Sequence, residues 1–351
     1  MKSSHTILIY LLLLLCVPVV CNAQQAYDEA RAKKLYTSTD FADHPTRDHE
    51  ADAKSILKSD SILQKAAEEN RVSFRKIFTK SRVDDLKIPL YIFEPTKLKR
   101  KEKHPALVWV YGGIHDHFGI NYFPFIKEAI DKGYVVIAPE YRGARGYGKA
   151  FYDAIDYGGY EVDDIITTGE FIQERMAYVD ADRIGVIGWS HGGYIALLAA
   201  TRDETIFNSA VASVPVTNLI FRLSYKGPEY QRTFTTQKRI QGLPFEKREL
   251  YLERSPLYQV DKLQIPVMVQ VATNDTDVDF VEAEMLINAL KVKKPDLAET
   301  VIYQDPPHEH FFNRQVDLIS LERKDTPEQI DSWNKIWGFL DQQLSPIAAK
   351  P

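Results

Sequence analysis

Short apolar runs alternate with longer segments of helical period along most of the chain. Apolar runs of four to six residues predict strands at 106–111, 134–138, 184–188, 210–214, 266–271 and 300–303. Apolar residues three and four apart predict helices at about 122–132, 161–177, 191–202, 279–293 and 327–343. Buried strands that are regularly separated by helices predict an α/β fold, with a mostly parallel, twisted sheet covered by helices on both faces.

Two features precede this alternation. Residues 24–72 are polar and rich in Lys, Glu and Asp, with isolated apolar pairs at loose helical spacing, so we expect a short helical extension there. Two apolar runs at 74–78 and 86–93, separated by Asp84-Asp85, predict a strand hairpin. We therefore expect one main domain over 73–346.

The segment from about 216 to 262 interrupts the alternation with aromatic, basic and proline residues. It predicts an insertion that caps the carboxyl edge of the sheet, where open α/β folds bind their ligands. Phe221 and Tyr225 follow the predicted strand at 210–214 by only a few residues. They are the candidates for contact with a substrate.

The first 23 residues have the pattern of a secretory leader. Lys2 precedes an apolar stretch from Ile7 to Val20, and small residues end it at Ala23. The stretch covers about 21 Å as a helix, against about 30 Å of hydrocarbon, so no stable membrane span is expected. We expect cleavage after Ala23 and a secreted or periplasmic protein; a lipid anchor on Cys21 is the alternative, which the bulky Val20 disfavours.

Composition narrows the possible partners. The 351 residues include 44 basic and 49 acidic side chains, giving a net charge of -5, so no strong field attracts a phosphate backbone and we expect no nucleic-acid partner. The two cysteines, Cys16 and Cys21, both lie in the leader. The mature chain therefore has no disulfide, no thiolate metal site and no cysteine nucleophile. The oligomeric state does not follow from the sequence.

Residues 188–193, Gly-Trp-Ser-His-Gly-Gly, contain the motif G-x-S-x-G directly between a predicted strand and a predicted helix. In this context the glycines permit a strained turn that exposes the serine hydroxyl, and the helix N-terminus favours developing negative charge. The motif predicts that Ser190 is a nucleophile.

A nucleophilic serine needs a base, and the base needs a carboxylate to hold its tautomer. Asp275 follows the predicted strand at 266–271, in the loop where the acid of such a set belongs. Asp277 and Asp279 compete with it, but we interpret them as turn or helix-capping residues.

Two histidines follow the last predicted strand, in the segment Gln304 to Phe312. His308 and His310 are two residues apart, so they cannot both face the serine. We favour His310 as the base because an aromatic residue follows it at the second position, and His308 is its rival.

The sequence resembles the prolyl oligopeptidase family of serine peptidases from about residue 76 to 345. Besides the serine motif, three stretches match the family's segments Y-R-G-S-x-G-Y-G, Y-V-D-x-x-R-I-G and S-P-L in the same order, at 141–151, 178–185 and 255–257. The resemblance implies an α/β-hydrolase catalytic domain that transfers an acyl group to serine, without a cofactor.

The same resemblance suggests an oxyanion site. Tyr111-Gly112-Gly113 corresponds to the family segment in which several members place a tyrosine hydroxyl. It implies that the Tyr111 hydroxyl and the backbone N–H of His191 hold the oxyanion, where one donor is worth about 3 kcal/mol. The alternative is that Tyr111 is a core residue at a strand end.

The sequence differs from large family members in two ways that affect the substrate. The residues before the domain are too few for a β-propeller, and no Glu-Glu pair of the kind that binds a free amino terminus is present. We therefore expect a peptidase acting on short peptides, with a carboxylesterase as the alternative and a non-catalytic binding protein as the third hypothesis.

Two other motifs are set aside. Residues 143–149 fit G-x-x-x-x-G-K, but Ala150 lacks the hydroxyl that would bind Mg²⁺ in a phosphate-binding loop. His115 and His117 lie two residues apart near the oxyanion segment, with no third ligand identifiable, so no metal site is expected.

Overall fold

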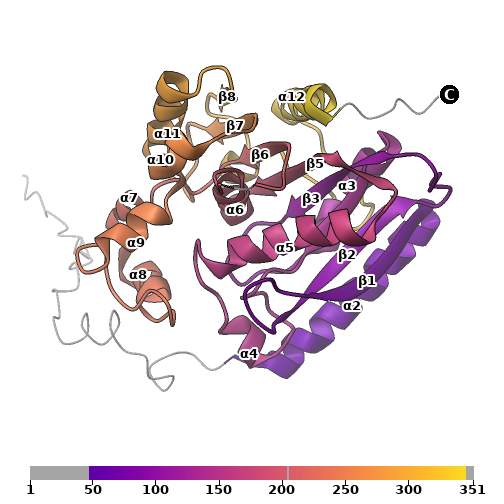
Figure 1. Ribbon diagram of the computed structural model, residues 1–351, viewed down its shortest axis with the longest axis horizontal. Coiled ribbons are helices and arrows are strands. Elements are labelled where there is room, and N and C mark those ends of the chain that lie inside the picture. The colour runs from indigo at the N-terminus through magenta and orange to yellow at the C-terminus, as the bar shows by residue number, and fades with distance from the viewer. Residues whose placement is uncertain (1–46, 204, 345–351) are drawn as a thin grey trace, which may run out of the picture.

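One sheet organises the molecule (Figure 1). The computed structural model describes residues 47–203 and 205–344, and its strands lie in the order β1-β2-β4-β3-β5-β6-β7-β8. β2 pairs antiparallel with β1 and with β4, and every later pair is parallel, which confirms the predicted mostly parallel sheet. The strands are β1 (Val72–Lys80), β2 (Lys87–Pro95), β3 (His104–Val110), β4 (Val135–Pro139), β5 (Val179–Trp189), β6 (Ser209–Ser213), β7 (Val267–Ala272) and β8 (Ala298–Tyr303).

Helices cover both faces of the sheet. They include α3 (Phe123–Asp131), α5 (Tyr160–Arg175), α6 (His191–Ala200), α11 (Phe280–Lys293) and α12 (Pro327–Leu344). A Cβ on Gly188 would meet α6, whereas a Cβ on Gly185 would meet Leu344 of α12. Side chains three residues apart in a strand point to opposite faces, so α6 and α12 lie on opposite faces. Figure 1 shows α5 crossing the same face as α6, and the two helices are in contact.

An aromatic cluster packs α12 against the carboxyl ends of β3 and β5. The Trp109 ring lies 4.9 Å from Trp189 and 6.0 Å from Trp333 of α12, measured between centroids, and all three are fully buried. Large aromatic rings contribute much of the apolar area of a core. The cluster therefore supports the strand end that carries Ser190.

The polar extension contributes one long helix, α2 (His49–Glu69). Its Ile56 and Leu63 are buried, while their neighbours Leu57 and Ile62 are exposed, as expected of an amphipathic surface helix. Asp60 ties it to the hairpin by accepting from the Lys76 ammonium and the Tyr91 hydroxyl, at 2.7 Å each. The leader and residues 24–46 lie outside the described residues, so export stays a prediction. Within the described residues no helix has the length and apolarity needed to cross a membrane.

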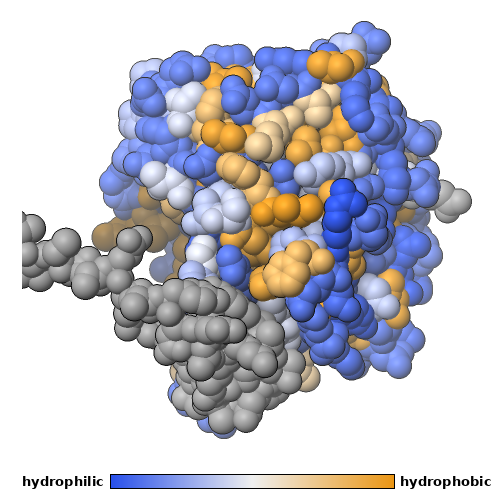
Figure 2. Space-filling model, turned by 90° about the vertical axis from the view of Figure 1, so that its left-hand side faces the viewer, coloured by the Kyte–Doolittle hydropathy of each residue, from blue (hydrophilic) through white to orange (hydrophobic). Residues whose placement is uncertain are grey.

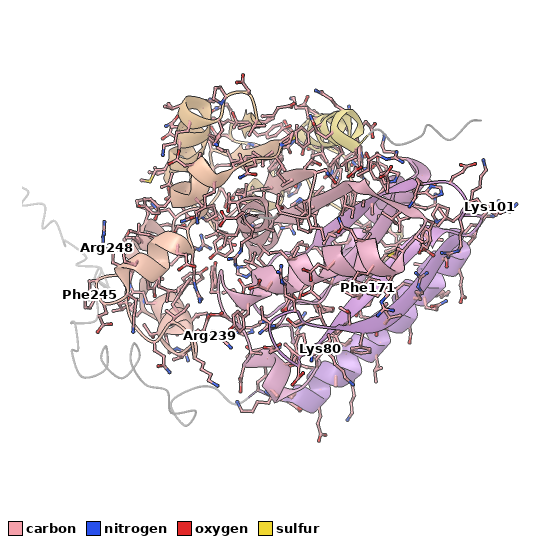
Figure 3. The ribbon with its side chains drawn as sticks, in the orientation of Figure 1. Lys80, Lys101, Phe171, Arg239, Phe245 and Arg248 are labelled. Carbon is pink, nitrogen blue, oxygen red and sulfur yellow. The ribbon has the colours of Figure 1, made fainter. Side chains whose placement is uncertain are left out.

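The predicted insertion folds as short helices between β6 and β7, on the left of Figure 1. They are α7 (Leu219–Tyr225), α8 (Gly227–Thr235), α9 (Arg248–Glu253), α10 (Pro256–Gln259) and the 3₁₀ helix η3 (Val260–Lys262). Figure 2 shows this side of the molecule, where apolar side chains form a band among hydrophilic ones. Phe245 and Arg248 lie at the outer edge of the insertion in Figure 3, and Phe245 is 80% exposed.

Two elements differ from the predictions. β5 begins at Val179, five residues before the predicted run at 184–188, because Asp180, Asp182 and Arg183 break the apolar pattern in a strand end that projects from the core. The short helix α4 (Lys149–Tyr152) was not predicted. A single helical turn carries too few positions for a periodic signal.

A buried ion pair joins three segments that are far apart in sequence. Arg142, after β4, donates from Nε and Nη2 to the two oxygens of Asp164 in α5, at 2.8 Å each. Its Nη1 donates to Asp84 of the hairpin at 2.9 Å. Arg142 and Asp164 are fully buried, so removal of the arginine would leave an unpaired carboxylate in the core.

Arg142→Ala should lower the free energy of unfolding by about 3–5 kcal/mol, because it leaves the buried Asp164 carboxylate without a charged partner. Urea denaturation of the two proteins at neutral pH measures the difference. Arg82→Ala is the control: Arg82 pairs with Glu170 at 3.4 Å on the surface, and such a pair contributes about 1 kcal/mol at most. Equal losses in the two variants would contradict this account.

Candidate active site

Ser190 occupies a strained turn between β5 and α6. Its φ of 54° and ψ of -119° lie outside the regions that residues with a side chain ordinarily adopt. The turn is held by the Ser190 N–H, which donates to the carbonyl of Ser213 at 2.9 Å. Ser190 stands at the N-cap of α6, yet its side chain makes no capping hydrogen bond. Its hydroxyl is therefore left for chemistry.

The glycines of the motif are required by close backbone contacts. A Cβ on Gly188 would overlap the carbonyl oxygen of Gly192, and a Cβ on Gly192 would overlap those of Val110 and Tyr111. Only glycine lets β3, β5 and α6 approach this closely. The spacing G-x-S-x-G is thus a packing requirement of the turn.

His310 and Asp275 meet at the ends of β8 and β7. His310, in the 3₁₀ helix η4 (Glu309–Phe311), places Nδ1 2.7 Å from Asp275 Oδ2, and both side chains are buried. The other oxygen, Asp275 Oδ1, accepts the backbone N–H groups of Asp277 and Val278 at 2.9 Å each. The carboxylate is therefore fixed, and donation from Nδ1 leaves Nε2 of the neutral ring as an acceptor.

The rival histidine lies elsewhere. His308 is exposed in the turn before η4, where its φ is 67°. Of the two rings, the structure brings only His310 to Asp275.

Asn313 holds the loop of His310 against the turn of Ser190. Its amide donates to Ser332 Oγ at 3.0 Å and to Ser213 Oγ at 3.3 Å, and its Oδ1 accepts the indole N–H of Trp189 at 3.2 Å. Ser213 is also the residue that binds the Ser190 N–H. Sequence reasoning missed Asn313, because a single buried amide has no periodic or motif signal.

The hydroxyl of Ser190 and the ring of His310 are not joined by a hydrogen bond in this structure. No hydrogen bond of 3.5 Å or less is found between the two over 47–203 and 205–344. The Oδ2 of Asp277 lies 3.6 Å from His310 Nε2. Catalytic hydrogen bonds are often long without substrate and tighten in the complex. The arrangement therefore suits a proton acceptor that engages Ser190 when a substrate binds.

The N-terminus of α6 supplies the backbone N–H groups next to Ser190. His191 begins this helix, and its ring is buried with Nε2 2.9 Å from Glu161 Oε1. Glu161 Oε1 also accepts the N–H of Gly158 at 2.9 Å. The Glu161 carboxylate thus lies beside the ring without hydrogen-bond geometry to it. The backbone N–H of His191, which is predicted to bind the oxyanion, stands at a helix N-terminus that favours negative charge.

Tyr111 is a fully buried residue of the core. Its ring is fully buried and stacks on Tyr141 with centroids 4.6 Å apart. Burial and the nearby Glu140 charge raise the pKa of Tyr111 well above its ordinary value. No hydrogen-bond partner of its hydroxyl is found in the described part of the chain. An oxyanion role stays a prediction, both for this hydroxyl and for the backbone N–H of His191.

The two candidate substrate contacts lie on α7 of the insertion. The Tyr225 hydroxyl donates to Glu282 of α11, and it accepts from Arg222 Nη1 at 2.9 Å and from the Asp279 N–H at 3.2 Å. The Phe221 ring lies 5.5 Å from that of Tyr225. These bonds make Tyr225 a support of the insertion, and substrate contact by either residue stays a prediction.

Comparison with known proteins identifies the relatives of this arrangement. Residues 121–345 match the sequence profile described as "Prolyl oligopeptidase family". The chain is 27% identical over 283 residues to the uncharacterized peptidase YuxL of Bacillus subtilis (strain 168), covering 80% of this chain and 41% of that protein. It is 31% identical over 179 residues to human dipeptidyl peptidase 8, covering 49% of this chain and 19% of that protein.

Solved structures show the same fold. The acylaminoacyl peptidase of Pyrococcus horikoshii superposes with a TM-score of 0.65 at 20% identity, over 80% of this chain and 43% of that one. Porphyromonas gingivalis dipeptidyl peptidase 4 gives a TM-score of 0.61 at 24% identity, over 77% of this chain and 35% of that one. The chain thus spans less than half the length of each of these proteins.

Asn313→Ala should remove the support of the His310 loop. We expect the free energy of unfolding to fall by about 1–3 kcal/mol, because buried partners lose their hydrogen bonds. Turnover should fall more than substrate affinity, because the base is displaced while the binding surface is kept. Urea denaturation and steady-state kinetics measure both effects. Gln304→Ala, an exposed site near the same loop, is the control; a loss of the same size there would contradict the prediction.

Glu140→Gln should change how stability depends on pH. Burial raises the pKa of Glu140 from 4.5 to about 7, so the folded protein binds a proton that the unfolded chain releases. The contribution of this bound proton to the free energy of unfolding is complete below pH 4.5. It is lost as pH rises through about 7, which lowers the free energy of unfolding by up to about 3 kcal/mol. Glutamine is neutral at every pH, so the variant does not lose this free energy. As pH rises from 4.5 to about 7, the variant should therefore gain stability relative to the native protein. A difference that is constant from pH 4 to pH 8, measured by urea denaturation, would contradict the prediction.

Proposed function

The chain belongs to the prolyl oligopeptidase family, and on that premise we propose that it is a serine peptidase that cleaves short peptides through an acyl-enzyme on Ser190. The observation that carries the proposal is the buried 2.7 Å contact between His310 and Asp275, on a loop that Asn313 ties to the turn of Ser190. A nucleophile, a base and an orienting carboxylate from three separated segments are the parts that acyl transfer to serine requires.

The proposed reaction begins when Ser190 Oγ attacks the carbonyl carbon of the peptide bond. Its proton passes to His310 Nε2, and the buried Asp275 carboxylate stabilises the imidazolium that forms. The carbonyl oxygen becomes negatively charged at the N-terminus of α6, where the backbone N–H of His191 and the helix dipole stabilise it.

Collapse of this intermediate breaks the C–N bond. His310 returns the proton to the leaving amine, and the acyl group stays on Ser190 as an ester. Water then attacks that ester with His310 as base, which releases the acid and restores the hydroxyl. Esters enter the same sequence more easily, because an alkoxide leaves without the full proton transfer that an amine needs.

Ser190→Ala should abolish both fluorophosphonate labelling and the hydrolysis of dialanyl p-nitroanilide, with a loss in turnover of about 10⁴-fold or more. His310→Ala should give a comparable loss, because without its base the hydroxyl is a poor nucleophile.

His308→Ala is the matched control for the histidine assignment, since that ring is exposed and only two residues away. It should keep most of the native rate. Equal losses in the two histidine variants, or activity that survives Ser190→Ala, would overturn the proposed mechanism. Acetate esters assayed beside the anilides test the substrate class; turnover of esters alone would overturn the peptidase proposal.

A further inference from the structure

Asp277 places a negative charge on the outer side of the proposed base. Its Oδ2 lies 3.6 Å from His310 Nε2, the nitrogen that faces away from Asp275. The Asp277 side chain is 52% exposed, whereas those of His310 and Asp275 are buried. Among these three groups, Asp277 is the one that a bound substrate can touch.

The position of Asp277 is fixed by its neighbours. Its N–H donates to Asp275 Oδ1 at 2.9 Å, and its carbonyl accepts from Arg222 Nη1 at 3.2 Å. Its Oδ1 accepts from the Lys226 ammonium at 2.7 Å. Oδ2 is left facing the imidazole, beyond hydrogen-bond distance, so it keeps its capacity to accept a hydrogen bond.

Asp277 carries its charge at neutral pH. Burial would raise the pKa of Asp277, but the Lys226 hydrogen bond and the neighbouring His310 ring lower it below its ordinary value. The other ionisable groups around the imidazole are Asp275 on Nδ1 and Glu309 of the same loop, which accepts from Thr276 Oγ1 at 2.8 Å. Lys226 and Arg222 are the cations that face this set from the insertion. Lys226 binds Oδ1 of Asp277, so Oδ2 is the oxygen left to bind a substrate cation.

The reacting bond must come close to Asp277. Ser190 Oγ has to approach within about 3 Å of Nε2, and the substrate carbonyl carbon within about 3.5 Å of Oγ. Asp277 Oδ2 then lies no farther than about 10 Å from the scissile bond, the length of three extended residues. An ammonium at the start of a short peptide, or at the end of a lysine side chain, can span that distance.

We propose that Asp277 is a specificity-determining residue that favours peptide substrates with a cationic group within three residues of the scissile bond. The inference rests on the proposed peptidase function and names its substrate class. The cation binds at Asp277 Oδ2, beside the proton-transferring nitrogen and opposite the oxygen held by Lys226. Two sources supply this chemistry, a free α-ammonium and a basic side chain.

Asp277→Asn tests the proposal with four p-nitroanilides in two matched pairs. The first pair is dialanyl and acetyl-dialanyl p-nitroanilide, which differ in the α-ammonium. The second is acetyl-lysyl-alanyl and acetyl-glutaminyl-alanyl p-nitroanilide, which differ in the side-chain charge. The native enzyme should prefer the cationic member of at least one pair by about tenfold in kcat/KM, and the variant should bring that ratio close to one.

The pair whose ratio collapses identifies the source of the cation. A preference for the α-ammonium should also disappear above about pH 8, where that group loses its proton, whereas a preference for lysine should persist. Glu284→Gln is the control, because it removes a carboxylate charge from an exposed position of α11, the helix that follows the loop of Asp277, and it should keep the native ratios. Ratios near one in the native enzyme, or ratios that Asp277→Asn leaves unchanged, would overturn the proposal.

Binding separates this inference from the proposed function. Titration calorimetry of the same peptides with Ser190→Ala requires no turnover. The cationic member of the pair should bind this variant about tenfold more tightly, and the difference should disappear in the double variant that also carries Asp277→Asn. If no anilide is hydrolysed by the native enzyme but this binding difference holds, the peptidase proposal fails and the role of Asp277 stands. If the anilides are hydrolysed but the binding difference is missing, the role of Asp277 fails alone.

Discussion

The buried contact between His310 Nδ1 and Asp275 Oδ2 is the interaction on which the active-site arrangement depends. It spans 2.7 Å and joins the loops after β7 and β8, which are neighbours in the sheet. A buried carboxylate is costly unless its oxygens are paired, and here the backbone of 277–278 and the imidazole satisfy both oxygens. The ring is thereby held with one nitrogen used and the other directed outward.

The rest of the fold supplies the second half of the site. The parallel arrangement brings the carboxyl end of β5 beside those of β6 and β7, so the serine turn and the acid loop meet at one sheet edge. Asn313 then connects this edge to α12 through Ser332, while the tryptophan cluster supports it from below. Strain in the turn of Ser190 is tolerated because these surrounding contacts leave it no alternative conformation.

The insertion is bound to α11 and to the acid loop at this edge. Glu282 of α11 binds the backbone N–H of Thr217 at 2.7 Å and the guanidinium of Arg222 at 3.3 Å, which anchors α7 beside the acid loop. Lys226, directly after α7, thereby comes to Asp277. The charge beside His310 is therefore set jointly by the insertion and by the loop after β7.

The strands, the main helices, the serine turn and the loops of the acid and the histidine could be predicted before the fold was known, because they depend on local periodicity and on glycine spacing. Three features appear only in the packed molecule: His310 rather than His308 meets Asp275, Tyr111 is buried, and Asp277 lies beside the proposed base. Each of these depends on how separate segments pack, and side chains two residues apart in one loop have no periodic signal that distinguishes them. For the same reason, only the packed structure reveals Asn313 as the link between the histidine loop and the serine turn.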